Sequence, residues 1–393
     1  MFKKLFYYGG FSVGTTLFGV FSLPVLTAFL TPSEYGVLGL ALTVLALLLP
    51  LNTFSNEHNV QKLRTNSSLD EYYSYWSALC SFSFLVLTVA FLLAIVIVYL
   101  FNLSTVFCLI PALAFARAFR LLKQAELTVT EREFLYGMST LLVAVLSFII
   151  TFSVFYFYNS SASIRVFGLL LAEFLVCVVV LKIKFDFQFN VVKIREIMLF
   201  GFPLMISVIP AWFINESSRF FLLRYLSLTE VGFFTLAFQI SAIYLQFNTV
   251  LANTFVKRIL ENIEEAFKFK FVSLIFSIQI VCVLTFLVSM NLFGGYFLPD
   301  SYLSSLTTAN YLVIGAFFQS LGLLPSYYLS YYRSTKFRLY SLIVAAVVAI
   351  FLNFFLIPNY GTLGAALSYI TAMLTYSLTL WFVVIRKKRN FNI

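Results

Sequence analysis

The sequence predicts an all-α integral membrane protein with twelve transmembrane helices in two parallel six-helix halves around a central cavity. Of its 393 residues, 61% are hydrophobic and only 11% are charged. An average soluble domain is about half apolar and about a quarter charged. The apolar residues fall in blocks of roughly 18 to 25, the length that a helix needs to cross a bilayer core of about 30 Å. Because no long polar segment remains for a soluble catalytic domain, we expect a protein that is not an enzyme.

Each apolar block is interpreted as one membrane span. The first block follows Lys3 and Lys4, and it continues to about Thr31 without a cleavage pattern, so it is interpreted as a helix and not as a signal peptide. The predicted spans are roughly 7–30, 36–51, 76–99, 103–121, 138–158, 165–181, 198–224, 232–252, 271–292, 310–331, 339–356 and 362–385.

The distribution of positive charge predicts the orientation. An even number of spans puts both termini on one side of the membrane, and 23 of the 26 Lys and Arg residues fall on that side. Only Arg165, Arg219 and Arg224 fall on the other side. Since short cytoplasmic loops carry the excess of Lys and Arg, both termini are predicted to be cytoplasmic. The net charge of +10 is therefore a topology signal, and no nucleic-acid partner is expected.

An internal repeat appears when the chain is shifted by 196 residues. The segment 30–36 then aligns with 226–232, and Glu34 falls on Glu230. Gly36 falls on Gly232 under the same shift, and Gly168 falls on Gly364. This repeat predicts two halves, 1–196 and 197–393. Halves with an even number of spans enter the membrane from the same side and form a parallel repeat, which is typical of transporters.

Charged residues inside the spans are candidates for a binding site, because a charge near the bilayer centre costs at least about 2.5–3.5 kcal/mol. Glu216 and Arg219 lie three residues apart on one face of the seventh span. Arg219 suits a phosphate ligand because its planar guanidinium binds two oxygens at once. A structural ion pair is the alternative. Arg224 is a substrate-binding candidate as well, although its position favours the membrane interface.

Two further candidates lie in the first half. Arg117 and Arg120 end the fourth span on the cytoplasmic side, where they fit either a phosphate-gathering entrance or ordinary flanking charges. Glu173 is central in the sixth span, and no basic residue lies one turn away on the same helix. It is either a protonatable coupling site or a neutral group hydrogen-bonded between helices.

The sequence offers little for metal or cofactor chemistry. The four cysteines are widely spaced within apolar blocks, and His58 is the only histidine. No Gly-x-x-x-x-Gly-Lys loop for nucleotide phosphates occurs. We therefore expect no metal site and no cofactor.

Several segments resemble one known family over nearly the whole chain. They are the segment 30–36 (LTPSEYG), Phe200-Gly-Phe-Pro203, Ser218-Arg219 followed by the segment 226–232, and the segment 353–366 (NFFLIPNYGTLGAA). In this order they resemble the bacterial polysaccharide flippases, the O-antigen translocases of the Wzx type, within the multidrug/oligosaccharidyl-lipid/polysaccharide exporter superfamily.

The resemblance implies a carrier in the bacterial inner membrane. Its substrate would be an undecaprenyl-diphosphate-linked oligosaccharide, which moves from the cytoplasmic to the periplasmic leaflet for lipopolysaccharide assembly, with a polysaccharide polymerase as a partner. Family members usually carry an acidic residue directly before the arginine of the seventh span. Here Ser218 takes that place, and Glu216 lies two residues earlier.

Two other functions stay open at this point. A multidrug antiporter of the same superfamily would share the twelve spans, and acidic cation sites would be expected in place of arginines. A polysaccharide polymerase or a membrane glycosyltransferase would have a similar number of spans. Such enzymes generally need a substantial outer loop, whereas the longest outer loop, near 293–309, carries a single charge, Asp300.

Overall fold

The chain folds into two compact units in the computed structural model, which describes residues 2–261, 263, 267–332 and 334–390. Unit 1 comprises Met1–Leu30 and Val37–Ile209, and unit 2 comprises Thr31–Gly36 and Pro210–Ile393. Within the described residues the regular elements are all helices. The units divide inside a helix, and the first turn of the second helix belongs to unit 2. The halves predicted at 1–196 and 197–393 were defined by the sequence repeat, and they stay a prediction.

Seven helices and one π-helix precede the long helix that enters both units. They are α1 (Phe2–Phe29), α2 (Pro32–Thr53), α3 (Glu57–Asn66), α4 (Leu69–Phe101), α5 (Val106–Val129), α6 (Glu133–Phe157), α7 (Ala162–Leu175) and η1 (Val176–Val180). The long helix is α8 (Val191–Tyr225). The following elements are α9 (Leu228–Glu261), α11 (Phe269–Phe297), the 3₁₀ turn η2 (Asp300–Tyr302), α12 (Ser304–Leu321), α13 (Leu323–Tyr331) and α14 (Thr335–Asn390).

The prediction of an all-helical integral membrane protein is confirmed. Each predicted span coincides with a helix, with α12 and α13 together covering 310–331. The last two spans form α14, which Gly361 divides by a non-helical backbone conformation with φ +58°. Among the described residues, nine helices are long and apolar enough to cross a membrane when α14 is counted once, and Val13–Phe29 is a shorter apolar helix. The helix α5 falls outside this set, and charged side chains interrupt its apolar sequence.

The short helix α3 was not predicted, because its sequence lies in a polar gap between two apolar blocks. It is amphipathic, and it buries Val60 and Leu63 in the core of unit 1. The Asn59 side-chain amide donates to the Tyr75 hydroxyl at 2.8 Å, which fastens α3 to α4. A polar segment thus folds back on the bundle through one apolar face.

Helix starts follow local capping rules. Ser68 precedes α4 and accepts a hydrogen bond from the backbone amide of Glu71 at 3.3 Å. The helices α2 and α9 begin with the same three-residue spacing. The hydroxyls of Thr31 and Ser227 accept hydrogen bonds from the backbone amides of Glu34 and Glu230, each at 3.3 Å. Hydroxyl side chains at these positions satisfy backbone donors that a helix start leaves unpaired.

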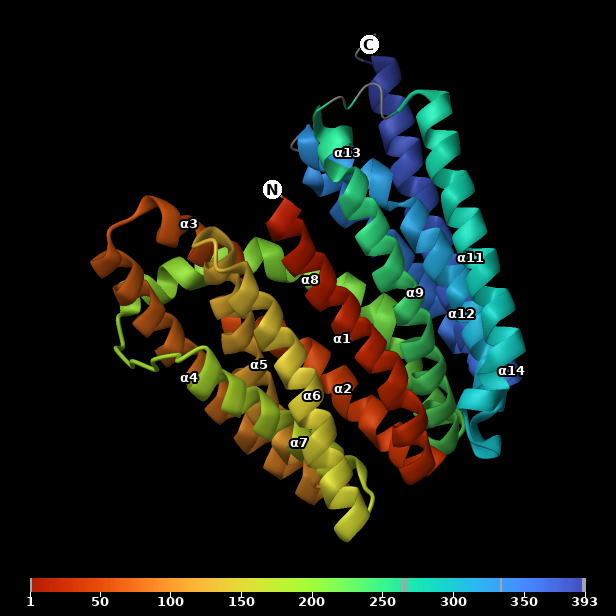
Figure 1. Cartoon of the computed structure of the whole chain (residues 1–393), viewed down its shortest axis with the longest axis horizontal. Helices are drawn as coiled ribbons and strands as arrows, with labels where there is room; N and C mark the ends of the chain where they lie inside the picture. Colours follow the sequence, from red (N-terminus) through yellow and green to blue (C-terminus); the bar gives the residue numbers. More distant parts are fainter. Residues whose placement is uncertain (1, 262, 264–266, 333, 391–393) are drawn as a thin grey trace. The chain divides into compact units, whose positions relative to one another are not determined.

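Each unit is a bundle whose helices run side by side. In unit 1, α6 packs against α1 and α7, and α5 packs against α3, α4 and α7 (Figure 1). In unit 2, α12 packs against α9, α11 and α14 (Figure 1). The core of unit 1 includes Trp76, Phe119 and Val176, which come from α4, α5 and η1. These contacts between α5, α7 and their neighbours position the charged groups described next.

Candidate functional site

A charged cluster lies buried between α5 and α7 in unit 1. Arg117 donates from Nε to Oε1 of Glu173 at 2.8 Å, and Arg120 donates from Nε to Oε2 of the same carboxylate at 2.5 Å. A second nitrogen of Arg120, Nη2, lies 3.2 Å from Oε1. The Glu173 side chain has no solvent exposure. One carboxylate therefore holds two guanidinium groups, and the cluster carries one net positive charge.

The two arginines differ in how completely their donors are used. Arg120 also donates from Nη1 to Gln124 Oε1 at 3.2 Å, and Gln124 in turn donates to the hydroxyls of Ser139 and Thr140, each at 2.8 Å. Arg120 is thus fixed by α5, α6 and α7 together. The Arg117 side chain is 24% exposed. Its terminal amino groups make no hydrogen bond to another described residue. Arg117 is thus the more accessible arginine of the cluster.

The pairing answers one question about Glu173. Sequence alone offered a protonatable carboxyl or a neutral hydrogen-bonded group, because no basic residue lies one turn away on α7. The structure supplies the partners from α5. Two guanidinium groups at this distance offset the charge of the carboxylate and hold it between α5 and α7. A coupling role for Glu173 would therefore require the arginines to move away first.

A second charged pair lies on α8 in unit 2. Arg219 forms an ion pair with Glu216, as their spacing predicts. Arg219 also donates from Nε to Thr235 Oγ1 at 3.2 Å and from Nη1 to the Asn215 carbonyl at 3.3 Å. Its guanidinium carbon lies 5.0 Å from the ring centre of Phe238, within range of a cation–π contact.

The accessibility of this pair differs from that of the first cluster. Arg219 is only 5% exposed, whereas the Glu216 side chain is 16% exposed. In this conformation Arg219 is thus covered by α9, and Glu216 is the more accessible partner. An anion could approach the Arg219 guanidinium only after the packing against Thr235 and Phe238 changed.

Two serines beside the pair connect α8 to α14. Ser218 Oγ donates to Asn353 Oδ1, and Asn353 Nδ2 donates to Ser217 Oγ, each at 3.2 Å. All three residues are buried. Members of the family that the sequence resembles usually carry an acidic residue at the position of Ser218. Here Ser218 instead makes an uncharged hydrogen bond between α8 and α14. Sequence reasoning noted Asn353 as part of a family segment and missed this contact.

Arg224 is separate from both clusters. It is exposed and lies in the last turn of α8, with its guanidinium carbon 5.9 Å from the ring centre of Tyr225. A cation at a helix C-terminus interacts favourably with the helix dipole.

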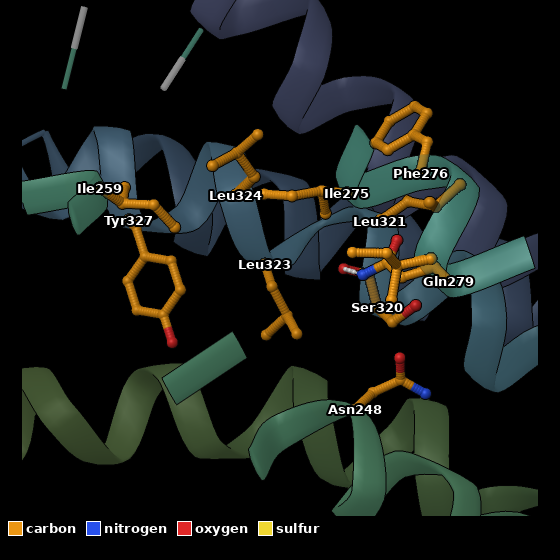
Figure 2. Close-up of a pocket in the computed structure, with 11 residues that line it drawn as sticks. Asn248, Ile259, Ile275, Phe276, Gln279, Ser320, Leu321, Leu323, Leu324 and Tyr327 are labelled. Carbon is orange, nitrogen blue, oxygen red and sulfur yellow. Dashed lines mark hydrogen bonds between the residues drawn. The ribbon is translucent and has the colours of Figure 1, made fainter. Parts of the chain in front are cut away.

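A small cavity in unit 2 is too small for a headgroup. Its volume is about 30 Å³, and Asn248, Gln279 and Ser320 form its polar wall (Figure 2). The Gln279 amide donates to the Ser320 carbonyl at 3.3 Å. A water molecule needs roughly 10–15 Å³ of such space, so the cavity has room for two or three waters and not for a sugar.

Metal ligands do not gather in the described ranges of the chain. No group of three or more His, Cys, Asp or Glu side chains there is placed to hold a metal ion.

Comparison with solved structures shows the fold. The chain is similar to the lipid II flippase MurJ in an inward closed conformation, with a TM-score of 0.79 and 14% identity over 95% of this chain and 87% of that chain. It is also similar to an inward-facing multidrug resistance MATE family transporter of the MOP superfamily, with a TM-score of 0.67 and 13% identity over 95% and 96% of the two chains. A eukaryotic MATE transporter, AtDTX14, matches with a TM-score of 0.61 and 16% identity over 98% and 95%.

Comparison by sequence gives a more specific result. Among curated protein sequences, none matches the chain significantly. Residues 25–260 match a family described as "Polysaccharide biosynthesis protein", which covers more than half of the chain. The resemblance inferred from the motifs and the MurJ/MATE-like fold agree with this match, and the chain belongs to the polysaccharide biosynthesis protein family.

Proposed function

We propose that this protein is a flippase for a lipid-linked oligosaccharide. It moves an undecaprenyl-diphosphate-linked repeat unit from the cytoplasmic to the periplasmic leaflet by alternating access, for the assembly of an O-antigen-like surface polysaccharide. The observation that carries this proposal is the family match across residues 25–260 on a fold shared with a lipid II flippase.

The chemistry of the substrate explains why a protein is needed. A diphosphate with attached sugars cannot enter hydrocarbon unaided, because unpaired charges and hydroxyls lose their hydration there. A flippase must replace water with fixed cations and hydrogen-bond donors. The cluster of Arg117, Arg120 and Glu173 provides a fixed cation with open donors on Arg117. We assign the first contact with the diphosphate to Arg117, with Arg120 and Glu173 as positioning residues.

The remaining candidates take supporting roles in this proposal. Arg219 and Glu216 would engage the substrate in a state where the packing of Arg219 against Phe238 has opened. Arg224, in the last turn of α8, would attract the anionic headgroup at the membrane interface. Separation of Glu173 from its arginines would expose a carboxylate that can couple transport to an ion.

The second candidate function is a multidrug antiporter, which the fold shared with MATE transporters favours. Antiporters for cationic drugs need an uncompensated carboxylate. In the two clusters described above, each carboxylate is paired with arginine, Glu173 with two and Glu216 with one. This electrostatic balance suits an anionic substrate better than a cationic one.

The proposal includes a location and an orientation. The protein would lie in the bacterial inner membrane with both termini in the cytoplasm, as the 23 of 26 basic residues on the terminal side predict. A C-terminal fusion to a fluorescent protein that matures only in the cytoplasm tests this orientation; a dark fusion with normal expression would contradict it. A polysaccharide polymerase would then use the flipped repeat unit.

The decisive experiment deletes the gene and follows lipid-linked glycan and surface polysaccharide together, with the wild-type gene restored on a plasmid as the control. We expect complete repeat units to accumulate on the cytoplasmic leaflet while the surface polymer is lost. Repeat units that reach the periplasm without polymerising would instead identify a polymerase. Normal polysaccharide with increased drug sensitivity would favour the antiporter.

A further inference from the structure

A groove of about 400 Å³ opens on unit 1 at the ends of three helices. Its wall comes from the first turns of α4, the last turns of α5 and the extended segment that follows η1, which lies beside α4 in Figure 1. Predicted span 76–99 begins here, and spans 103–121 and 165–181 end here. The groove therefore lies at the boundary between hydrocarbon and water, on the side of the membrane that carries most of the basic residues.

The extended segment aims two lysines into the groove. Leu181 and Ile183 are buried in the core of unit 1, whereas Lys182 and Lys184 alternate with them and are exposed. Burial of the apolar pair in the core leaves the two lysines on the exposed side of the segment, where both line the groove. The Trp76 indole donates to the Lys184 carbonyl at 3.2 Å and holds the segment against α4.

The backbone at this place is unusual as well. The π-helix η1 ends at Val180, and Lys182 then adopts a left-handed conformation with φ +49°. Both features are uncommon for ordinary residues and tend to occur at functional sites. Together they turn the chain so that Lys182 reaches the groove that Lys184 also lines.

The charges of the groove do not cancel. On its other side, Glu126 accepts hydrogen bonds from Lys123 at 2.6 Å and from the Tyr72 hydroxyl at 2.9 Å, and Arg64 lies 3.4 Å away. These donors offset the Glu126 carboxylate. Lys182 and Lys184 have no ion pair with any described residue, and Asp186 is the only other acid that lines the groove. The groove therefore presents net positive charge, with Trp76 and the 61% exposed Tyr73 beside it.

The remainder of α4, beyond the groove, indicates what kind of anionic molecule would bind there. The α4 helix exposes Phe84, Leu85, Val89 and Leu92 along its membrane-spanning part. Such a continuous apolar face suits acyl chains, and basic pockets at the cytoplasmic ends of membrane helices bind anionic lipid headgroups. Aromatic side chains at the same level belong to the membrane interface.

We propose that this groove binds the phosphate headgroup of an anionic phospholipid, with Lys182 and Lys184 on the phosphate and the acyl chains along α4. The site is separate from the Arg117 cluster and does not depend on the proposed transport function.

The test uses the purified full chain and measures the rise of the thermal unfolding midpoint when lipid is added. The probes are phosphatidylglycerol, the zwitterionic phosphatidylcholine and inorganic diphosphate. The variant is Lys182→Asn with Lys184→Gln, since Asn tolerates a positive φ better than Gln. The matched control is Lys268→Gln with Lys270→Gln, which removes two exposed lysines from unit 2.

We expect phosphatidylglycerol to stabilise the wild type and the control variant more than phosphatidylcholine does. The groove variant should require at least about tenfold more phosphatidylglycerol for the same rise, because each lysine near a lipid surface contributes about 1 kcal/mol. Equal stabilisation of all three proteins would overturn the proposal. Full stabilisation by inorganic diphosphate would identify a soluble ligand and overturn the assignment to lipid.

Discussion

Gly36 and Gly232 contact each other's helices in a reciprocal way within unit 2. A Cβ atom on Gly36 would overlap the carbonyl oxygen of Leu228, and a Cβ atom on Gly232 would overlap the carbonyl oxygen of Pro32. Gly36 and Gly232 are 196 residues apart, and so are Pro32 and Leu228. The first turns of α2 and α9 therefore pack in an equivalent way. The glycine of each helix lies against the carbonyl of the first residue of the other helix.

Replacing either glycine by alanine should destabilise the protein. Backbone atoms of the opposite helix occupy the space of the new methyl group, so the helices must separate, at a cost of about 1–3 kcal/mol. Thermal unfolding midpoints in detergent should fall for Gly36→Ala and Gly232→Ala. Gly295→Ala is the matched control, because nothing lies within 4 Å of its Cβ position and alanine favours a helix. A fall as large in the control would contradict the close-contact explanation.

Several helix ends follow the 196-residue spacing of the sequence repeat. The helices α1 and α8 end at Phe29 and Tyr225, and α2 and α9 begin at Pro32 and Leu228. Both pairs are 196 residues apart. The aligned segments 30–36 and 226–232 contain the capping residues and the contact glycines, so their similarity has a local structural cause. Outside these two segments, the apolar sequence predicts where a span lies but not which other helices it packs against.

The candidate site was only partly predictable. The spacing of Glu216 and Arg219 on one helix predicted their ion pair, because residues three apart share a face. The partners of Glu173 lie 53 and 56 residues away on α5. Hydropathy locates both helices and does not determine which of them pack together. The groove at Lys182 and Lys184 was missed for a related reason, since its walls come from three separate segments.

Removing the Glu173 carboxylate should strongly destabilise unit 1. Glu173→Gln leaves two guanidinium groups without their counter-charge, and breaking a buried pair in this way costs about 3–5 kcal/mol. We expect a large fall of the thermal unfolding midpoint. The control is Glu71→Gln, whose side chain is 46% exposed and 3.9 Å from Lys193, so that little stability is at stake.

A second change should partly rescue this variant. Adding Arg120→Gln to Glu173→Gln removes one of the two unpaired cations, so the double variant should unfold at a higher temperature than Glu173→Gln alone. A double variant that loses the sum of both single effects would show that the residues act independently.

Substitutions of Arg117 and Arg120 should affect transport and thermal stability to different degrees. Arg117→Gln removes the open donors and one contact to Glu173, while Arg120 still pairs with this carboxylate. We therefore expect transport to fall at least about tenfold and the unfolding midpoint to fall less than in Arg120→Gln. Arg120→Gln removes the contacts to Glu173 and Gln124 and should lower the midpoint. Accumulation of lipid-linked repeat units and thermal unfolding of the purified protein are the two readouts. Normal transport by a stable Arg117→Gln protein would remove Arg117 from the substrate site.

Asn353 should be needed for the packing of α14 on α8. Asn353→Leu leaves the buried Ser217 and Ser218 hydroxyls without this partner, which is expected to cost about 1–3 kcal/mol. The variant Asn359→Leu is the control, because Asn359 is exposed and its amide bonds only to the carbonyl of Phe355 on its own helix among the contacts described. Equal thermal stability of the two variants would show that the contact between α8 and α14 contributes nothing.

Arg219 should tolerate lysine poorly, because its contacts depend on the guanidinium shape. Nε reaches Thr235, Nη1 reaches the Asn215 carbonyl and Glu216, and the flat face lies over Phe238. Lysine keeps the charge and loses the planar fork. We expect Arg219→Ala to abolish most transport and Arg219→Lys to keep part of it, with both unfolding at lower temperature than the wild type. If Arg219→Ala unfolded earlier and still transported normally, Arg219 would be a structural residue, and phosphate recognition would rest on Arg117.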